Sequence, residues 1–347
     1  MKSAGHREST GRPMTATGRR ALVFFICCVM VFCLPLSSSA RGKSRKYTPR
    51  SRRAPAHSVK QQEKVAFVNV PYSSVFGRGS ESAEHVTEVL LGDEFRVIGE
   101  SDGWYYGYIP SQKDYRGWIR AGNLLFTTSA PATESSTYVI VKSAQTMLTL
   151  RDGSSMTVFA GTRLPMLKNH GWRYEVLLPD GSRAYLPADS SSPEKGLAAA
   201  EISPNDILAA SKFNQADYKW GGITSGGMDC SGFVYTSFRI NGIFLKRDSY
   251  LQAEEGSDVS ADQLQPADLV FFRTSKAKRI SHVGIYIGNG NFIHSSRSKK
   301  GVAISSLSDE PFKHMFAGAR RILSRPSKTV RNDSQAAYFS AVVGGRT

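Results

Sequence analysis

The sequence predicts an α+β protein in which two small antiparallel sheets precede a larger domain. Short runs with apolar residues at every second position, broken by Gly, Ser and Asp, fill residues 65–128 and recur more loosely over 138–188. This alternation is typical of half-buried strands. Beyond residue 204 a helical segment precedes several strand-like runs, and segregated helices and strands indicate the α+β class. The apolar fraction of 40% suffices for packed cores, which excludes a wholly disordered chain.

The net charge of +16 belongs mainly to the N-terminal part of the chain. Residues 1–64 hold 14 of the 45 Lys and Arg and 2 of the 29 Asp and Glu, so the rest is nearly balanced. The two small sheets are not basic overall, and an exported protein meets little nucleic acid. We therefore expect no nucleic acid among the partners.

The N-terminus has the pattern of an export signal. A 16-residue apolar run at 21–36 follows two arginines and precedes the small residues Ser38 and Ala40. A basic flank, a short apolar core and a small-residue cleavage site indicate a signal peptide over 1–40. The alternative is an uncleaved anchor, although the run is shorter than the ~18 residues of a membrane span. We expect an exported protein, in the periplasm, at the cell surface or secreted.

Three segments lack an apolar period. Residues 41–64 are basic and rich in Ser and Pro, which predicts a disordered arm. The arm is either a solvated tether or an electrostatic contact with anionic wall polymer or membrane. Residues 189–203 are interpreted as a linker and 324–347 as a tail.

The two small sheets form a tandem pair in the sequence. Gly103-Trp104 and Gly171-Trp172 lie at equivalent positions, and the offset between matching segments is 67 to 69 residues. The first copy resembles bacterial SH3-like (SH3b) barrels, and the second is a diverged copy in which Tyr185 stands where the first has Trp118. The resemblance implies two SH3-like β-barrels, with Trp104 and Trp118 as packing or groove residues.

The C-terminal domain is expected over 204–323. Ser203 and Pro204 suit the N-cap and first position of a helix. A second apolar-faced helix is predicted from Cys230 to the Asn241-Gly242 turn. Three strand-like runs follow, DLVFFR, HVGIYIG and NFIHSS.

Cys230 is the one cysteine that remains after removal of the signal peptide, which contains the other three. It lies between a Gly-rich turn and a predicted helix start, where the helix dipole favours a thiolate and backbone N–H groups can bind an oxyanion. His282 and His294 are 12 residues apart in consecutive predicted strands. A hairpin would place them side by side, one as base and the other orienting it. One cysteine and two histidines without CxxC or HExxH spacing do not indicate zinc, and no metal or organic cofactor is expected.

Residues 204–323 strongly resemble the NlpC/P60 family of papain-like cysteine peptidases. The matching segments, in order, are YKWGG from Tyr218, MDCSGFV from Met228, KRDSYLQ from Lys246, PADLVFF from Pro266, SHVGIYIG from Ser281, FIHSS from Phe292 and GARRI from Gly318. The resemblance implies a papain-like domain with nucleophile Cys230, general base His282, orienting His294 and an oxyanion-hole tyrosine, Tyr218. The sequence departs from the family at Ala267, a turn position where glycine is usual, which puts local backbone shape in question.

The order of two SH3b domains and one NlpC/P60 domain resembles cell-wall endopeptidases. Those enzymes cut the γ-D-glutamyl–diamino acid bond of murein stem peptides, with diaminopimelate or lysine as the diamino acid, and recognise a free N-terminal L-Ala. The resemblance implies substrate contacts from Asp229, Ser231, Ser249, Glu84 and Tyr115. Glu84 and Tyr115 belong to the first barrel, where ordinary barrel surface is the alternative, and Arg247 and Gln252 are further candidates for the cleft.

Two rival functions remain open at this point. An N-acetylmuramoyl-L-alanine amidase or an acyltransferase would use the same fold on another bond. An inactive wall-binding protein is the second rival, although Cys230, His282 and His294 are all intact. The sequence predicts peptidoglycan stem peptides as substrate and indicates no oligomeric state.

Overall fold

The computed structural model describes residues 63–126, 137–194, 202–209, 213, 216–274 and 277–323. The expected signal peptide 1–40, nearly all of the arm 41–64 and the tail 324–347 lie outside these ranges. Within them, no helix is both long and apolar enough to cross a membrane.

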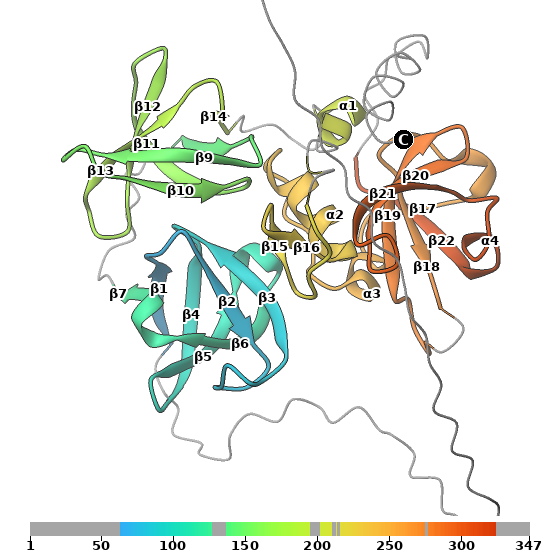
Figure 1. Cartoon of the computed structure of the whole chain (residues 1–347), viewed down its shortest axis with the longest axis horizontal. Coiled ribbons are helices and arrows are strands. Elements are labelled where there is room, and N and C mark those ends of the chain that lie inside the picture. Colours follow the sequence, from blue (N-terminus) through green and yellow to red (C-terminus); the bar gives the residue numbers. More distant parts are fainter. Residues whose placement is uncertain are drawn as a thin grey trace, which may run out of the picture. The chain divides into compact units, whose positions relative to one another are not determined.

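The first sheet has seven antiparallel strands in the order β3-β2-β6-β5-β4-β1-β7 (Figure 1). Alternating buried and half-buried residues, as in β4, give it one apolar face. Trp104 is buried and meets Phe76 edge to face, so it is a packing residue. The strands are β1 (Lys64–Val68), β2 (Tyr72–Phe76), β3 (His85–Leu90), β4 (Glu94–Ser101), β5 (Trp104–Ile109), β6 (Tyr115–Arg120) and β7 (Leu124–Phe126).

The second sheet repeats this strand order, β10-β9-β13-β12-β11-β8-β14. Its last strand, β14, pairs with β8 and lies inside the expected linker 189–203. That part of the linker prediction is wrong, because a run of three serines and a proline gives no strand signal by itself. The strands are β8 (Tyr138–Val141), β9 (Gln145–Leu150), β10 (Ser155–Phe159), β11 (Arg163–Asn169), β12 (Arg173–Leu177), β13 (Arg183–Pro187) and β14 (Ser191–Pro193).

The remaining residues form helices beside a six-stranded antiparallel sheet, in the order β17-β22-β18-β19-β20-β21. Ser203 caps the first helix with the reciprocal bonds of a capping box, as the sequence predicts. The helices are α1 (Pro204–Leu208), α2 (Cys230–Arg239), α3 (Ser249–Gln252) and α4 (Phe312–Met315). The strands are the hairpin β15 (Ile223–Thr224) and β16 (Gly227–Met228), then β17 (Ser257–Val259), β18 (Leu269–Phe272), β19 (His282–Gly288), β20 (Asn291–Ser296), β21 (Gly301–Ser306) and β22 (Phe316–Arg321).

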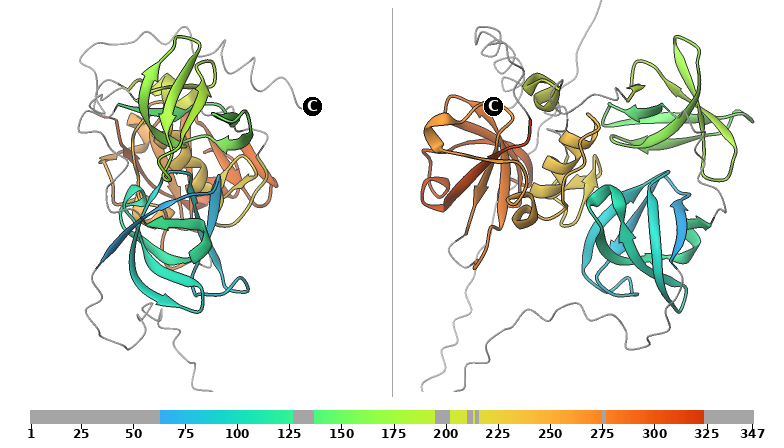
Figure 2. Two further views of the ribbon diagram at one scale, coloured as in Figure 1. Left: turned by 90° about the vertical axis from the view of Figure 1, so that its left-hand side faces the viewer. Right: turned by 180° about the vertical axis from the view of Figure 1, so that it is seen from behind.

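Helix α2 lies at the centre of the apolar core of the C-terminal region. All ten of its residues are buried, and it contacts β19 and β20. In Figure 2 the yellow and gold segment that contains α2 lies beside the orange and red sheet. Phe233, Val234 and Phe238 of α2 join Leu269, Val283 and Ile285 of the sheet in one apolar cluster. The helix ends as predicted, in a turn where Gly242 has a φ of +80°.

Buried ionic groups connect α2 and its preceding loop to the first sheet. Arg239 donates two hydrogen bonds to Asp93, at 2.5 and 3.1 Å, and a third to the carbonyl of Gly161 in the second sheet at 2.8 Å. Glu88 accepts from the backbone N–H of Ile223 at 2.9 Å and forms an ion pair with Lys219. The first sheet is therefore joined directly to the segments on both sides of Cys230.

Candidate active site

Cys230 is the first residue of α2, and the local sequence places it there. The β15–β16 hairpin leads into Asp229, which caps the helix by accepting the N–H of Gly232 at 2.6 Å. Gly232 is required at its position, because a Cβ atom would lie 2.0 Å from the carbonyl oxygen of Gly222. The thiol therefore sits at the positive end of a helix that is pressed against the Gly-rich turn.

The two predicted histidines meet, as expected from a hairpin. His282 opens β19, His294 lies in β20, and their Nε2 and Nδ1 atoms are 2.7 Å apart. His294 continues the chain from Nε2 to the hydroxyl of Ser305, at 3.0 Å. Sequence reasoning missed Ser305, and the register of β20 against β21 would have been needed to find it.

The residue after His282 contacts the thiol. The N–H of Val283, its neighbour, hydrogen-bonds the Cys230 sulfur. Because Nε2 of His282 is engaged with His294, Nδ1 is the ring nitrogen left to accept a proton. In that tautomer His282 donates from Nε2 to His294, which in turn donates to Ser305. The arrangement fixes the tautomer of His282 and leaves its Nδ1 as a candidate proton acceptor.

Burial keeps the thiol and the imidazole uncharged in the resting site. It raises the pKa of Cys230 to about 12, helped by the charge of Asp229 and opposed by the N–H groups of Val283 and Ser231. Burial lowers the pKa of His282 to about 4 and that of His294 well below 6.5. The rings of Phe272, Phe292 and Phe312 surround the two imidazoles.

Tyr218 lies beside the nucleophile. It forms a β-bridge with Met228, two residues before Cys230. Burial, with the nearby Cys230 and Asp229, raises the pKa of Tyr218 to about 12, while Arg297 opposes the rise. The hydroxyl therefore stays protonated at neutral pH and is able to donate to an oxyanion.

Three candidate substrate residues of this domain are nearly buried. Asp229, Ser231 and Ser249 are 5%, 5% and 8% exposed. Arg247 donates to both carboxylate oxygens of Asp229, at 2.8 and 3.1 Å, and to the Ser231 hydroxyl at 2.9 Å. Asp229 is thus a neutralised helix cap, and its contact with substrate stays a prediction.

Arg247 and Gln252 lie behind the site rather than along a cleft. Arg247 is 1% exposed and also donates to Thr87 of the first sheet at 2.9 Å. Gln252 is fully buried and donates to the carbonyl of Ser231 at 3.1 Å. Both support the first turn of α2, a role that no sequence spacing indicates.

The two first-sheet candidates reach loops that flank the nucleophile. Glu84 is exposed and accepts from the indole N–H of Trp220 at 3.2 Å. The hydroxyl of Tyr115 donates to Asp248, the residue between Arg247 and Ser249, at 3.1 Å. Both side chains therefore lie against the domain that carries Cys230, which ordinary barrel surface would not require.

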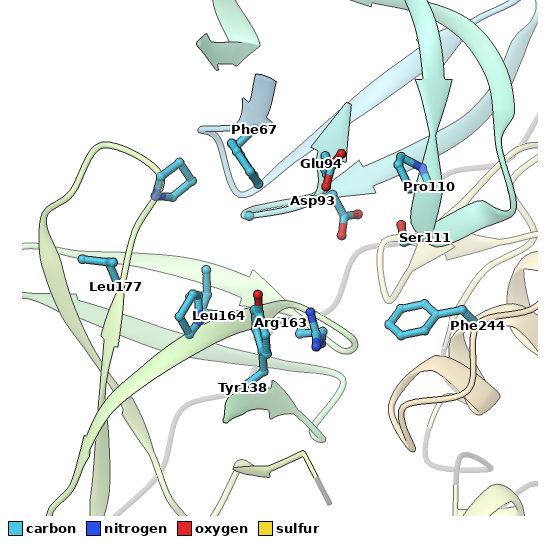
Figure 3. Close-up of a pocket in the computed structure, with 13 residues that line it drawn as sticks. Phe67, Asp93, Glu94, Pro110, Ser111, Tyr138, Arg163, Leu164, Leu177 and Phe244 are labelled. Atoms are coloured by element: carbon cyan, nitrogen blue, oxygen red, sulfur yellow. The ribbon is translucent and has the colours of Figure 1, made fainter. Parts of the chain in front are cut away.

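A pocket of about 300 Å³ lies elsewhere in the molecule (Figure 3). Its walls include Phe67 of the first sheet, Tyr138 and Leu164 of the second, and Phe244. None of the predicted site residues lines it. In the described part of the chain, no cluster of three or more His, Cys, Asp and Glu side chains is arranged to hold a metal ion.

Comparison with known proteins agrees with this geometry. Residues 215–321 match the NlpC/P60 family and residues 76–124 match the bacterial dipeptidyl-peptidase Sh3 domain. A γ-D-glutamyl-L-lysine dipeptidyl-peptidase of Bacillus cereus is 31% identical over 68% of this chain and 75% of its own length. The Bacillus subtilis protein of the same name is 30% identical over 69% and 81%.

The fold is similar to that of a solved relative. An NlpC/P60 family protein from Bacillus cereus superposes with a TM-score of 0.68 at 26% identity, covering 75% of this chain and all of that one. A cysteine at a helix N-terminus, a hydrogen-bonded pair of histidines and relatives similar over most of their length are found together. The chain belongs to the NlpC/P60 family of cysteine peptidases.

Proposed function

We propose that this protein is a peptidoglycan hydrolase that cuts the γ-D-glutamyl–diamino acid bond of murein stem peptides. The observation that carries the proposal is the placement of Cys230 at the start of α2 with the hydrogen-bonded pair His282 and His294 beside it. Relatives named as γ-D-glutamyl-L-lysine dipeptidyl-peptidases support the choice of bond.

The reaction is an acyl transfer through a thioester. Cys230 sulfur attacks the γ-carbonyl carbon while its proton passes to Nδ1 of His282. The oxyanion accepts from the N–H of Cys230 and the hydroxyl of Tyr218. The imidazolium then protonates the leaving amine, and the C–N bond breaks. Water, deprotonated by His282, hydrolyses the thioester and restores the thiol.

In this proposal the stem peptide that binds carries a free N-terminal L-Ala. An exposed carboxylate at Glu84 attracts an ammonium group, and the Tyr115 hydroxyl lies at the adjoining loop. Asp229, Ser231 and Ser249 are the proposed contacts for the glutamyl portion. Acylation of the L-Ala amine removes its charge and adds bulk, so it should abolish turnover.

The remaining parts of the chain fit an exported wall enzyme. We propose that the second sheet, which repeats the strand order of the first, is a second SH3-like domain. The sequence pattern of 1–40 supports export to the periplasm or cell surface, and the basic arm 41–64 supports contact with anionic wall polymer.

Product analysis tests the bond and separates the rival activities. Incubation with L-Ala-γ-D-Glu-diaminopimelate should release L-Ala-D-Glu, identified by mass, and the N-acetylated peptide should stay intact. Release of L-Ala from an N-acetylmuramoyl peptide would identify an amidase instead. Rapid cleavage of the N-acetylated peptide would contradict the roles of Glu84 and Tyr115.

A further inference from the structure

We propose that Arg297 is a positioning residue for catalysis, whose guanidinium binds the hydroxyl oxygen of Tyr218 and leaves the hydroxyl proton for the oxyanion. Arg297 lies in the turn between β20 and β21, three residues after His294. The inference rests on the proposed function, in which Tyr218 donates to the oxyanion, and it adds the residue that aims this donor.

The side chain of Arg297 lies against that of Tyr218. Its Cζ atom is 5.4 Å from the centre of the Tyr218 ring, and the guanidinium hydrogen-bonds the hydroxyl. A guanidinium carries N–H donors and no acceptor. The tyrosine oxygen is therefore the acceptor in this bond, and the phenol proton has to point to another group.

The phenol proton of Tyr218 has no acceptor among the residues that the structure describes. The hydroxyl of Tyr235, by contrast, donates to the carbonyl of Ser111 at 3.0 Å, so its proton is engaged within the protein. Tyr218 is half-buried and lies beside Cys230. A substrate bound at this thiol brings an acceptor for the free proton, the oxyanion of the tetrahedral intermediate.

Backbone contacts hold Arg297 and Tyr218 in place. The N–H of Tyr218 donates to the carbonyl of Lys300 at 3.1 Å, and the N–H of Lys300 donates to the carbonyl of Arg297 at 3.2 Å. A Cβ atom at Gly301 would lie 2.5 Å from the carbonyl oxygen of Ala216, so only glycine permits this approach. The guanidinium therefore reaches the phenol from a turn that is fixed to the tyrosine's own segment.

The charge of Arg297 makes Tyr218 a stronger donor. Within the described ranges, Arg297 forms no ion pair with a carboxylate. Its charge therefore acts on the phenol, where it opposes the rise of the Tyr218 pKa that burial causes. A nearby cation favours the anionic form of a phenol, so it also strengthens the hydrogen bond that the phenol donates.

The same arginine has a rival role in substrate binding. Its Cζ atom is 6.0 Å from the ring of Trp220, whose indole N–H donates to Glu84 on the proposed acyl side. From there the exposed guanidinium would meet the carboxylate of the D-Glu portion. Such a contact would lower KM and would not depend on the Tyr218 hydroxyl, so the two roles predict different kinetics.

A double-mutant cycle tests the assignment. The measurements are kcat and KM for L-Ala-γ-D-Glu-diaminopimelate with wild type, R297M, Y218F and the variant that combines both changes. R297M should lower kcat about tenfold and leave KM unchanged, because the charge-assisted bond to the donor is lost. R297K keeps a cationic donor and should retain most of kcat. In the Y218F background R297M should cause no further loss, since the group on which Arg297 acts is gone.

The controls separate this inference from the rival role and from the proposed function. Arg151, an exposed arginine after β9, gives the matched variant R151M, which should change neither kcat nor KM. An unchanged kcat in R297M, or an equal loss in the wild-type and Y218F backgrounds, would overturn the inference, and a raised KM would assign Arg297 to the D-Glu carboxylate. A wild-type protein that releases no L-Ala-D-Glu would instead refute the proposed function itself.

Discussion

At the scale of single residues, burial favours the uncharged forms of Cys230, His282 and His294. Phe312 and its aromatic neighbours cover the imidazoles, and burial lowers the pKa of His282 to about 4. The Cys230 thiol, with its pKa raised to about 12, keeps its proton until substrate arrives. In the proposed mechanism, proton transfer from the thiol to His282 is therefore coupled to attack on the substrate.

The pH profile of kcat/KM follows from this. His282 must be neutral to act as base, so activity should persist well below pH 6.5 and fall only toward about pH 4. Removing the aromatic cover in F312A should hydrate the imidazole and move the acid limb upward toward 6.5. The exposed Phe126 provides the control F126A, which should leave the profile unchanged. A wild-type acid limb at 6.5 would contradict the burial argument.

The same histidines connect stability to pH. Above pH 6.5 both histidines are neutral whether the chain is folded or unfolded, so they add no pH dependence to the free energy of unfolding. Below 6.5 the unfolded chain binds protons that the folded chain refuses, because both folded pKa values are lowered. The free energy of unfolding should therefore fall from pH 6.5 toward 4, by up to about 1.4 kcal/mol per pH unit for each histidine.

Chemical denaturation across that range, compared between wild type and H294N, measures this term. The variant should show a shallower dependence on pH, since one of the two buried histidines is gone. Identical slopes in the two proteins would show that His294 titrates normally in the folded state.

At the scale of elements, the turn before β18 carries a local strain. Ala267 has a φ of +74°, in the left-handed region that favours glycine, and its N–H donates to the carbonyl of Tyr286 at 2.9 Å. The family resemblance shows that glycine is usual at this position, and the positive φ of Ala267 explains why alanine is strained there. A non-glycine residue in this conformation lowers the stability of the folded protein by about 1 kcal/mol.

Replacing Ala267 with glycine should stabilise the protein by up to about 0.5 kcal/mol, because the relieved strain of about 1 kcal/mol slightly exceeds the added chain entropy of about 0.5–1 kcal/mol. Thermal or denaturant unfolding measures the change. Ala209 caps α1 with an ordinary right-handed conformation, so A209G should destabilise instead. Stabilisation by A209G, or a loss of stability in A267G, would contradict the conformational argument.

The elements that sequence predicted are those with local signals. The start of α2 at Cys230, its end before Gly242 and the β19–β20 hairpin all follow from caps, turns and alternation. Strand β14 and the pairing of β17 with β22 depend on partners distant in sequence. Their short segments carry no periodicity that could predict them.

At the scale of the whole molecule, the first sheet supports the catalytic helix through buried charges. Thr87 contacts Arg247, which holds the Asp229 cap of α2, and Asp93 holds Arg239 at the other end of the helix. The partners are 146 and 160 residues apart in sequence. No spacing rule in a single sequence could have predicted these pairs, whereas the contact between His282 and His294 follows from a local hairpin.

Breaking one of these pairs should be costly. D93A leaves the guanidinium of Arg239 buried without its carboxylate, which destabilises by about 3–5 kcal/mol. The exposed Asp258, which pairs with the half-buried Arg320, supplies the matched control, and D258A should cost less than about 1 kcal/mol. Equal effects in denaturant unfolding would show that the first sheet is not anchored through Asp93.

The central claim is that a single thiol performs the chemistry of an otherwise intact fold. The direct measurement is release of L-Ala-D-Glu from L-Ala-γ-D-Glu-diaminopimelate by wild type and by C230A, with thermal unfolding of both proteins recorded in parallel. We expect dipeptide from the wild type, none from C230A, and similar unfolding temperatures for the two proteins. Dipeptide release by folded C230A at the wild-type rate would contradict this claim.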